Sequence, residues 1–80
     1  MTGKNILYSA GDLVDIPIPG AVYSHRKAGD LYLVEGCLPI KLDGEWINNG
    51  VTIYIKEETR ETYARFTLDF MRSFSFVSES

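Results

Sequence analysis

The chain contains a single cysteine, Cys37, and a single histidine, His25, in 80 residues. A lone cysteine cannot form a disulfide within the chain, so the sequence predicts a protein of a reducing compartment, the cytoplasm. One His and one Cys also cannot supply the four ligands that a structural zinc site typically takes from one chain. We therefore expect neither a disulfide framework nor a zinc finger.

Signatures of catalysis and cofactor binding are absent as well. The sequence has no G-x-x-x-x-G-K-[ST], G-x-G-x-x-G, H-E-x-x-H, C-x-x-C or G-x-S-x-G motif. A nucleophilic pair of Cys37 and His25 is conceivable, but it would need an acid such as Asp30 to orient the base. A small apolar role for Cys37 is the more ordinary one. We expect a noncatalytic protein without a metal or another cofactor.

Long apolar runs are missing too. No stretch approaches the roughly 20 apolar residues that a helix needs to cross a bilayer. Near the N-terminus, Lys4 and Asn5 are followed by an apolar run of only three residues, 6–8, which is too short for a secretory signal. The sequence predicts a soluble protein without a membrane partner.

Basic residues are few and scattered. The chain has 8 Lys and Arg against 11 Asp and Glu, a formal net charge of −3. Only Arg26 and Lys27 are adjacent to one another. Because a negative chain is repelled by a phosphate backbone, nucleic acid is an unlikely partner.

What is present is the composition of an ordinary globular protein, with 45% hydrophobic and 24% charged residues. A chain of this length has room for one core, so residues 1–80 are predicted to form a single domain. The net stability of so small a core is roughly 3–5 kcal/mol, and a partner subunit often adds to it. A homodimer is one way to supply that stability.

Turn signals divide the first fifty residues into segments that are too short for stable helices. Gly and Pro occur only in this part of the chain. The predicted strands are Asn5–Ala10, Leu13–Ile18, Ala21–His25, Asp30–Glu35, Leu38–Leu42, Glu45–Ile47 and Val51–Lys56.

The strands between Leu38 and Lys56 are expected to form a double hairpin. Asp43-Gly44 is a preferred pair for a two-residue type I′ turn, in which both residues have positive φ. That turn pairs Leu42 with Glu45, Lys41 with Trp46, and Ile40 with Ile47. A second, three-residue loop at Asn48-Asn49-Gly50 would set Ile47 opposite Val51 and Trp46 opposite Thr52.

This register separates two faces of the double hairpin. The first face, predicted to be the core, collects Leu38, Ile40, Leu42, Ile47, Val51, Ile53 and Ile55. The second face collects Cys37, Pro39, Lys41, Trp46, Thr52, Tyr54 and Lys56.

The segment from Glu57 to Phe76 fits two periodicities. As a helix, it has an apolar stripe opposite a ladder of charges. As a strand over Tyr63–Phe76, it alternates aromatic residues with Thr, Ser and charged residues. Both alternatives stay open. The sequence predicts a mainly β fold, a small antiparallel barrel or sandwich of SH3-like or OB-like scale, with segment 57–76 either strand or one helix.

The second face of the double hairpin carries the functional hypothesis. Trp46, Tyr54 and Lys41 lie on it, and large rigid rings are enriched in protein-binding hot spots. We expect a noncatalytic interaction module that binds another protein through these residues, possibly as a homodimer or as an accessory or inhibitor protein. An alternative is a barrel that binds a small ligand or single-stranded nucleic acid, with the same rings stacking on bases.

Overall fold

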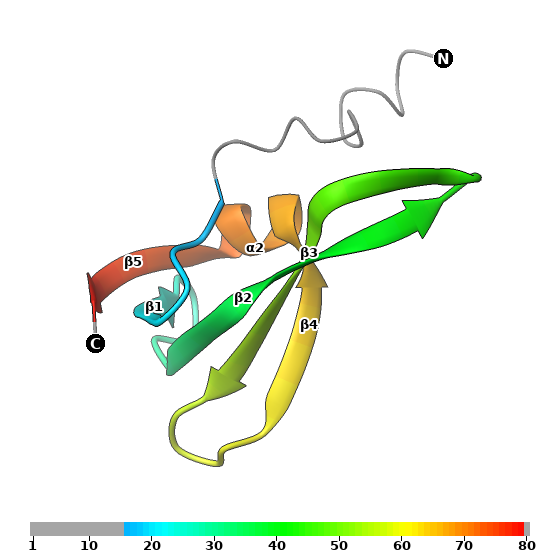
Figure 1. Ribbon diagram of the computed structural model, residues 1–80. Coiled ribbons are helices and arrows are strands. Elements are labelled where there is room, and N and C mark those ends of the chain that lie inside the picture. Colours follow the sequence, from blue (N-terminus) through cyan, green and yellow to red (C-terminus); the bar gives the residue numbers. More distant parts are fainter. Residues whose placement is uncertain (1–15, 80) are drawn as a thin grey trace.

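The computed structural model describes residues 16–79, and they form a mainly β fold with one short helix (Figure 1). The elements in chain order are β1 Ala21–His25, β2 Leu31–Leu42, β3 Glu45–Lys56, β4 Thr62–Phe66, α2 Thr67–Ser73 and β5 Phe74–Glu79. The predicted β-rich α+β class is confirmed.

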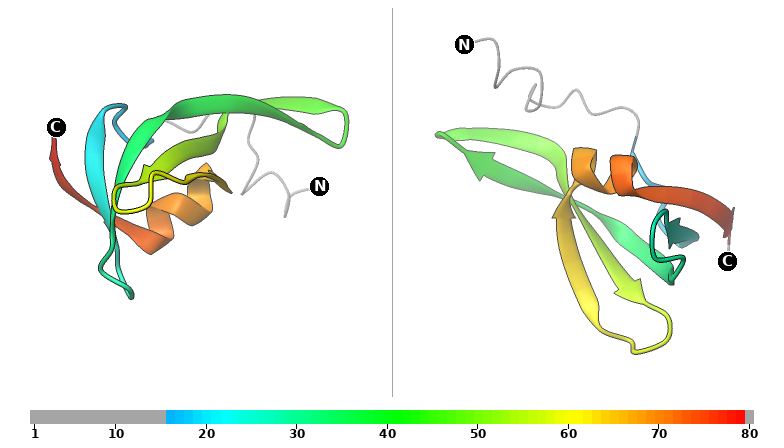
Figure 2. Two further views of the ribbon diagram at one scale, coloured as in Figure 1. Left: turned by 90° about the horizontal axis from the view of Figure 1, so that it is seen from below. Right: turned by 180° about the vertical axis from the view of Figure 1, so that it is seen from behind.

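The strands form one antiparallel five-stranded sheet in the order β4-β3-β2-β1-β5. Consecutive strands pair as hairpins from β1 to β4. After β4 the chain passes through α2 to the other side of the sheet, where β5 pairs with β1 (Figure 2). Within residues 16–79, β4 and β5 are the two edges and do not pair with each other. Closure into a barrel stays a prediction.

The first predicted turn and its register are confirmed. Asp43 and Gly44 both have positive φ, 50° and 80°, as a type I′ turn requires. Leu42 pairs with Glu45, Lys41 with Trp46, and Ile40 with Ile47. The turn therefore fixes the alignment of the two strands at the tip of this hairpin.

The second predicted loop is wrong, because Asn48–Gly50 lies inside the continuous strand β3. Ile47 faces Ile40 and Val51 faces Leu38, so three residues of β3 lie opposite the single residue Pro39. Proline donates no hydrogen bond to a strand ladder, and Asn tolerates the left-handed conformation that Asn49 adopts at φ 59°. These residues make a bulge instead of a turn.

Gly50 has a packing role within this bulge. A Cβ atom at this position would lie 2.5 Å from Cγ2 of Ile40 and 3.1 Å from the carbonyl oxygen of Ile47. The absence of a side chain therefore lets Ile40 and Ile47 close over the backbone of β3. The glycine that suggested a turn in the sequence permits close packing.

The helix covers the face of the sheet that was not predicted to be the core. Thr52 and Tyr54 on this face are buried beneath α2, at 0% and 4% exposure. Of the residues predicted as core, Ile47 is buried at 2% exposure, whereas Val51, Ile53 and Ile55 are only partly buried and Leu38 is 53% exposed. The rest of that prediction was wrong because Phe70 of α2 and Phe74 at the start of β5 pack their rings against the aromatic side of β3.

An aromatic cluster forms the centre of the core. The rings of Phe70 and Phe74 are stacked, with centroids 4.2 Å apart and an interplanar angle of 5°. Tyr54 contacts both of them, at 5.0 Å and 5.3 Å between centroids. The buried cluster consists of Ala21, Tyr23, Val34, Tyr54, Phe70 and Phe74.

The C-terminal segment combines both alternatives that the sequence left open. It runs as strand β4, then one helix, α2, then strand β5. Arg65 ties the three elements together: its guanidinium donates to Oη of Tyr54 at 2.9 Å and to Oδ2 of Asp69 at 2.8 Å, and it lies 5.1 Å from the Phe74 ring centroid. Each periodicity was therefore correct over part of the segment.

Residues 16–20, directly before β1, do not extend the sheet as a strand. The predicted strand Leu13–Ile18 is not formed at residues 16–18, where Pro17 is fully buried and the backbone N–H of Ile18 donates to Oη of Tyr23 at 3.0 Å. Proline at this position removes a ladder donor, which explains the irregular path. The predicted strand Asn5–Ala10 lies outside the described residues.

We expect Phe70→Ala to destabilise the fold by about 3–5 kcal/mol, because it empties the centre of the aromatic cluster. That loss is comparable with the whole net stability of a domain of this size, so the variant should be largely unfolded at 25 °C. Urea titration followed by circular dichroism measures the effect. Leu31→Ala, at a side chain that is 42% exposed, is the control and should lose clearly less stability.

Candidate protein-binding surface

Trp46 lies near the tip of the β2–β3 hairpin and is 58% exposed. It is the only tryptophan of the chain. Lys41 is its cross-strand partner, and Nζ of Lys41 lies 5.9 Å from the centroid of the Trp46 ring. At this distance the ammonium group is attracted by the face of the indole. We call this pair the tip site.

The tip site is exposed because the hairpin extends beyond the helix. β2 and β3 each have 12 residues, whereas α2 has 7 and packs near the middle of the sheet. Both views in Figure 2 show the hairpin projecting away from α2 and β5. The described residues consequently have a long axis of 40 Å against 19 and 18 Å for the other two.

Tyr54, the third residue of the predicted site, is not part of this surface. It is buried at the centre of the core, and its hydroxyl accepts the hydrogen bond from Arg65. The prediction placed all three residues in one site on the second hairpin face. In the structure α2 covers the part of that face that carries Tyr54 and leaves the part with Trp46 and Lys41 exposed.

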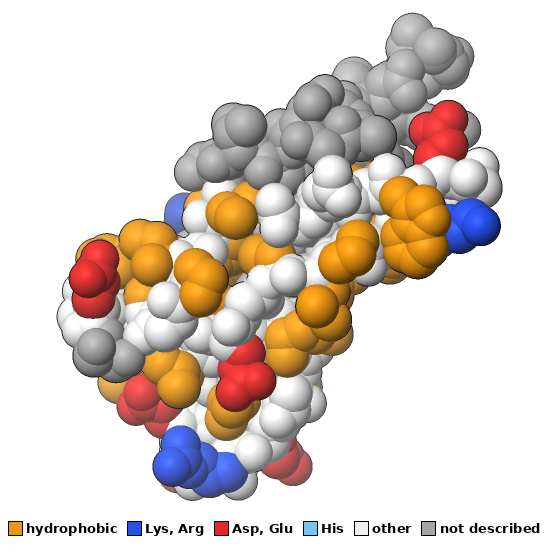
Figure 3. Space-filling model, in the orientation of Figure 1, with side chains coloured by type: hydrophobic (Ala, Val, Ile, Leu, Met, Phe, Trp, Pro, Cys, Tyr) orange, Lys and Arg blue, Asp and Glu red, His pale blue; other side chains and the backbone are white. Residues whose placement is uncertain are grey.

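A second apolar surface, which includes three residues of the predicted core face, lies on the side of the sheet away from α2. One row across three strands joins Leu38, Val51 and Phe66, of which Leu38 is 53% and Phe66 is 44% exposed. The next row joins Ile53 to Ala64. We call these five residues the aliphatic face, because all of them except Phe66 are aliphatic. Figure 3 shows hydrophobic side chains gathered over the hairpin.

The aliphatic face is hollowed where a side chain is missing. Gly36 lies opposite Ile53, next to a register shift in β2 at Glu35. A shallow depression there is lined by Glu35, Gly36, Cys37, Leu38 and Ile53. The depression therefore lies between the apolar side chains of Leu38 and Ile53.

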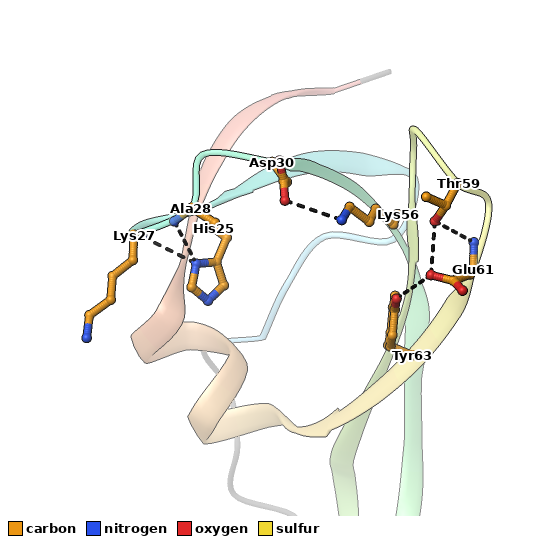
Figure 4. Close-up of polar contacts among 8 residues, drawn as sticks. All are labelled: His25, Lys27, Ala28, Asp30, Lys56, Thr59, Glu61 and Tyr63. Carbon is orange, nitrogen blue, oxygen red and sulfur yellow. Dashed lines mark hydrogen bonds and ion pairs between the residues drawn. The ribbon is translucent and has the colours of Figure 1, made fainter.

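Cys37 and His25 have separate partners. Sγ of Cys37 lies 3.4 Å from Oγ1 of Thr52, which in turn lies 2.9 Å from Oγ1 of Thr67. His25 accepts hydrogen bonds at Nδ1 from the backbone N–H groups of Lys27 and Ala28, at 3.3 and 3.1 Å (Figure 4). Within residues 16–79 no hydrogen bond joins the thiol to the imidazole, and each has a local structural role.

Charged contacts lie at the end of the sheet opposite the tip site. Nζ of Lys56 is 3.4 Å from Oδ2 of Asp30, and the hydrogen bond from this ammonium group to Asp30 raises the pKa of Lys56. Oη of Tyr63 donates to Oε1 of Glu61 at 2.6 Å, and Thr59 donates to the same oxygen at 3.2 Å (Figure 4). These two bonds, the one from Tyr63 first, lower the pKa of Glu61.

Residues 16–79 contain neither a cluster of metal ligands nor a helix that could span a membrane. No group of three or more His, Cys, Asp or Glu side chains in this range is placed to hold a metal ion. The only helix in the range, α2, is far too short to span a bilayer.

Comparison with known proteins finds no relative of this chain. Neither the family models, nor the curated proteins, nor the solved structures contain a significant match to this chain. The surfaces of the molecule itself are therefore the basis on which a function is proposed.

We expect the fluorescence of Trp46 to be red-shifted and readily quenched by acrylamide, because more than half of the side chain is in contact with water. The chain has one tryptophan, so the whole signal reports this site. The measurement is repeated over a dilution series. Blue-shifted emission protected from acrylamide at every concentration would show that the tip site is buried.

We expect Tyr63→Phe to raise the pKa of Glu61 toward its ordinary value, since the variant removes the hydrogen bond that lowers it most. A lowered pKa in the folded state stabilises the fold at pH values above the ordinary pKa of the carboxyl group. That contribution disappears as the pH falls through the lowered value.

Carbon-detected NMR titration of the Glu61 carboxyl group measures this pKa. Thr59→Ala is the comparison variant and should produce a smaller rise, because its bond is the second cause. Equal pKa values in wild type and Tyr63→Phe would contradict the assigned hydrogen bond.

Proposed function

We propose that this chain is a noncatalytic interaction module that binds another protein through the tip site, with Trp46 as the anchor. The exposure of Trp46 at the tip of the projecting hairpin is the observation that supports this proposal most directly. Tryptophan is among the residues most enriched at binding hot spots, because its large rigid ring provides much contact area at a low cost in conformational entropy.

The contribution of Trp46 to the binding free energy is expected to be that of a hot-spot residue. A tryptophan side chain inserted in a fitting pocket buries on the order of 200 Å² and contributes at least about 2 kcal/mol to binding. The type I′ turn and the pairing of Lys41 with Trp46 and of Ile40 with Ile47 hold Trp46 in place before binding. Pre-organisation of this kind reduces the entropy lost on association.

The charge at the tip favours a protein partner over nucleic acid. The positive charge of Lys41 is balanced by Glu45, which is exposed and adjacent to Trp46. A base-stacking site normally surrounds its aromatic ring with several cations that follow the phosphate backbone. A protein with an apolar pocket and a mixed polar rim complements the tip site better.

The aliphatic face supports the same proposal from a neighbouring part of the hairpin. Leu38 belongs to β2, as Lys41 does, and is 53% exposed. A partner that binds the tip and extends toward the depression beside Leu38 would cover apolar surface on two parts of one rigid hairpin.

We expect Trp46→Ala to weaken binding of the partner by about 30-fold or more, the ratio that corresponds to a loss of 2 kcal/mol. Candidate partners are first captured from the native host with the wild-type chain and with Leu31→Ala, an exposed apolar position outside both surfaces. Each candidate retained by both is purified and titrated against all three proteins.

The proposal requires at least one purified protein that binds the wild type and Leu31→Ala equally and Trp46→Ala weakly. Equal binding of every candidate to all three proteins would refute the role of the tip site. Salt-dependent quenching of Trp46 by a single-stranded oligonucleotide would instead support the alternative function.

A further inference from the structure

Of the features that usually prevent an edge from pairing, the edge strand β5 has a β-bulge but lacks the others described next. Edge strands are commonly blocked by proline, lysine or inward-pointing charges. Phe74–Glu79 contains no proline and no basic residue, and its single charged residue, Glu79, is at its end. Phe76 and Val77 are 50% and 49% exposed. A bulge at Val77 is the only irregularity in its pairing with β1.

Beyond Phe74, whose N–H donates to the carbonyl oxygen of Phe70 and whose carbonyl oxygen accepts from Arg26, the backbone of β5 has one free side. β1 pairs with it over Ala21–His25, and no other described strand lies beyond it. An extended segment could satisfy the outward N–H and C=O groups of β5 by adding a strand to the sheet. Edge pairing would also remove part of the exposed surface of Phe76 and Val77 from water.

The charges at the two ends of β5 indicate the direction of that added strand. Arg26, Lys27 and Arg72 surround a depression at the beginning of β5, whose lining also includes His25 and Ser73. The guanidinium of Arg26 donates to the carbonyl oxygens of Phe74 and Met71, which fixes this cluster to the start of the strand. At the opposite end, the exposed Glu79 carries a negative charge.

The three cations have no acidic partner in the part of the chain that the structure describes. The ion pairs there join Lys56 to Asp30 and Arg65 to Asp69. Three positive charges at one place in a chain of net charge −3 repel one another unless an anion lies nearby. They are available to an acidic group that approaches along the edge of β5.

We propose that β5 is a homodimer interface, in which it pairs antiparallel with β5 of a second copy about a two-fold axis near Phe76. Antiparallel pairing places the end of one β5 beside the beginning of the other. Glu79 of each copy then lies near the cationic cluster of the other copy, so the contact forms twice. The edge is therefore complementary to itself in charge as well as in backbone hydrogen bonding.

This interface leaves the tip site free. β5 and the tip of the β2–β3 hairpin lie at opposite sides of the molecule in both views of Figure 2. The inference does not depend on the proposed partner at Trp46, and the two can fail separately.

Sedimentation equilibrium of the full chain over a broad concentration range tests the proposal. The wild type should form dimers at high concentration and dissociate on dilution or at high salt, as a small edge interface does. Val77→Lys, which places a charge on the edge, and Glu79→Lys, which sets like charges together, should each raise the dissociation constant about tenfold or more.

Charge exchange makes the test specific for the antiparallel arrangement. Adding Arg72→Glu to Glu79→Lys restores opposite charges across the axis and should recover most of the lost affinity. Arg60→Glu, a reversal in the exposed β3–β4 turn, is the matched control and should leave dimerisation unchanged. Circular dichroism verifies that each variant folds.

Three results would overturn the interface. They are a monomer at every concentration, a dimer that is indifferent to Val77→Lys and Glu79→Lys, and a double charge exchange that fails to restore affinity. A dimer weakened by Trp46→Ala and not by the β5 variants would place the second copy at the tip site.

Discussion

The stack of Phe70 on Phe74 determines which side of the sheet becomes the core. Phe70 lies in the middle of α2 and Phe74 is the first residue of β5, so their contact ties the helix to the last strand. Tyr54 provides the surface of the sheet beneath them, and Arg65 closes the contact from the side by binding the hydroxyl of Tyr54. A helix of seven residues has little stability by itself, and this packing supplies it.

The short helix also explains why so much apolar surface remains outside the core. It covers only the middle of one face, whereas the hairpin strands are 12 residues long. The helix does not cover the aliphatic face, because that face lies on the opposite side of the sheet. It does not cover the tip site, because the hairpin extends past the end of the helix. A longer helix, or a second one, could have buried Leu38 or Trp46 and removed the surfaces on which the proposed binding depends.

Local chemistry made part of this structure predictable. The Asp43-Gly44 turn, its register and the pairing of Lys41 with Trp46 follow from backbone preferences of adjacent residues. The bulge opposite Pro39 did not follow, because Asn48–Gly50 has the composition of a hairpin loop. The burial of the Tyr54 face did not follow either, because it is decided by packing against Phe70 and Phe74, which lie far along the chain. Two of the three predicted site residues form one surface, and Tyr54 was misplaced with its face.

The positions of the two proposed interfaces have a consequence for affinity. If β5 joins two copies, their tip sites point away from the shared axis and can bind two sites on one partner or on a repetitive surface. The second contact is then intramolecular, with an effective concentration set by the rigid spacing of the tips. Avidity would strengthen a modest interaction at each Trp46 without any new contact. A sheet edge at one side and a projecting hairpin at the other give this arrangement from a single small chain.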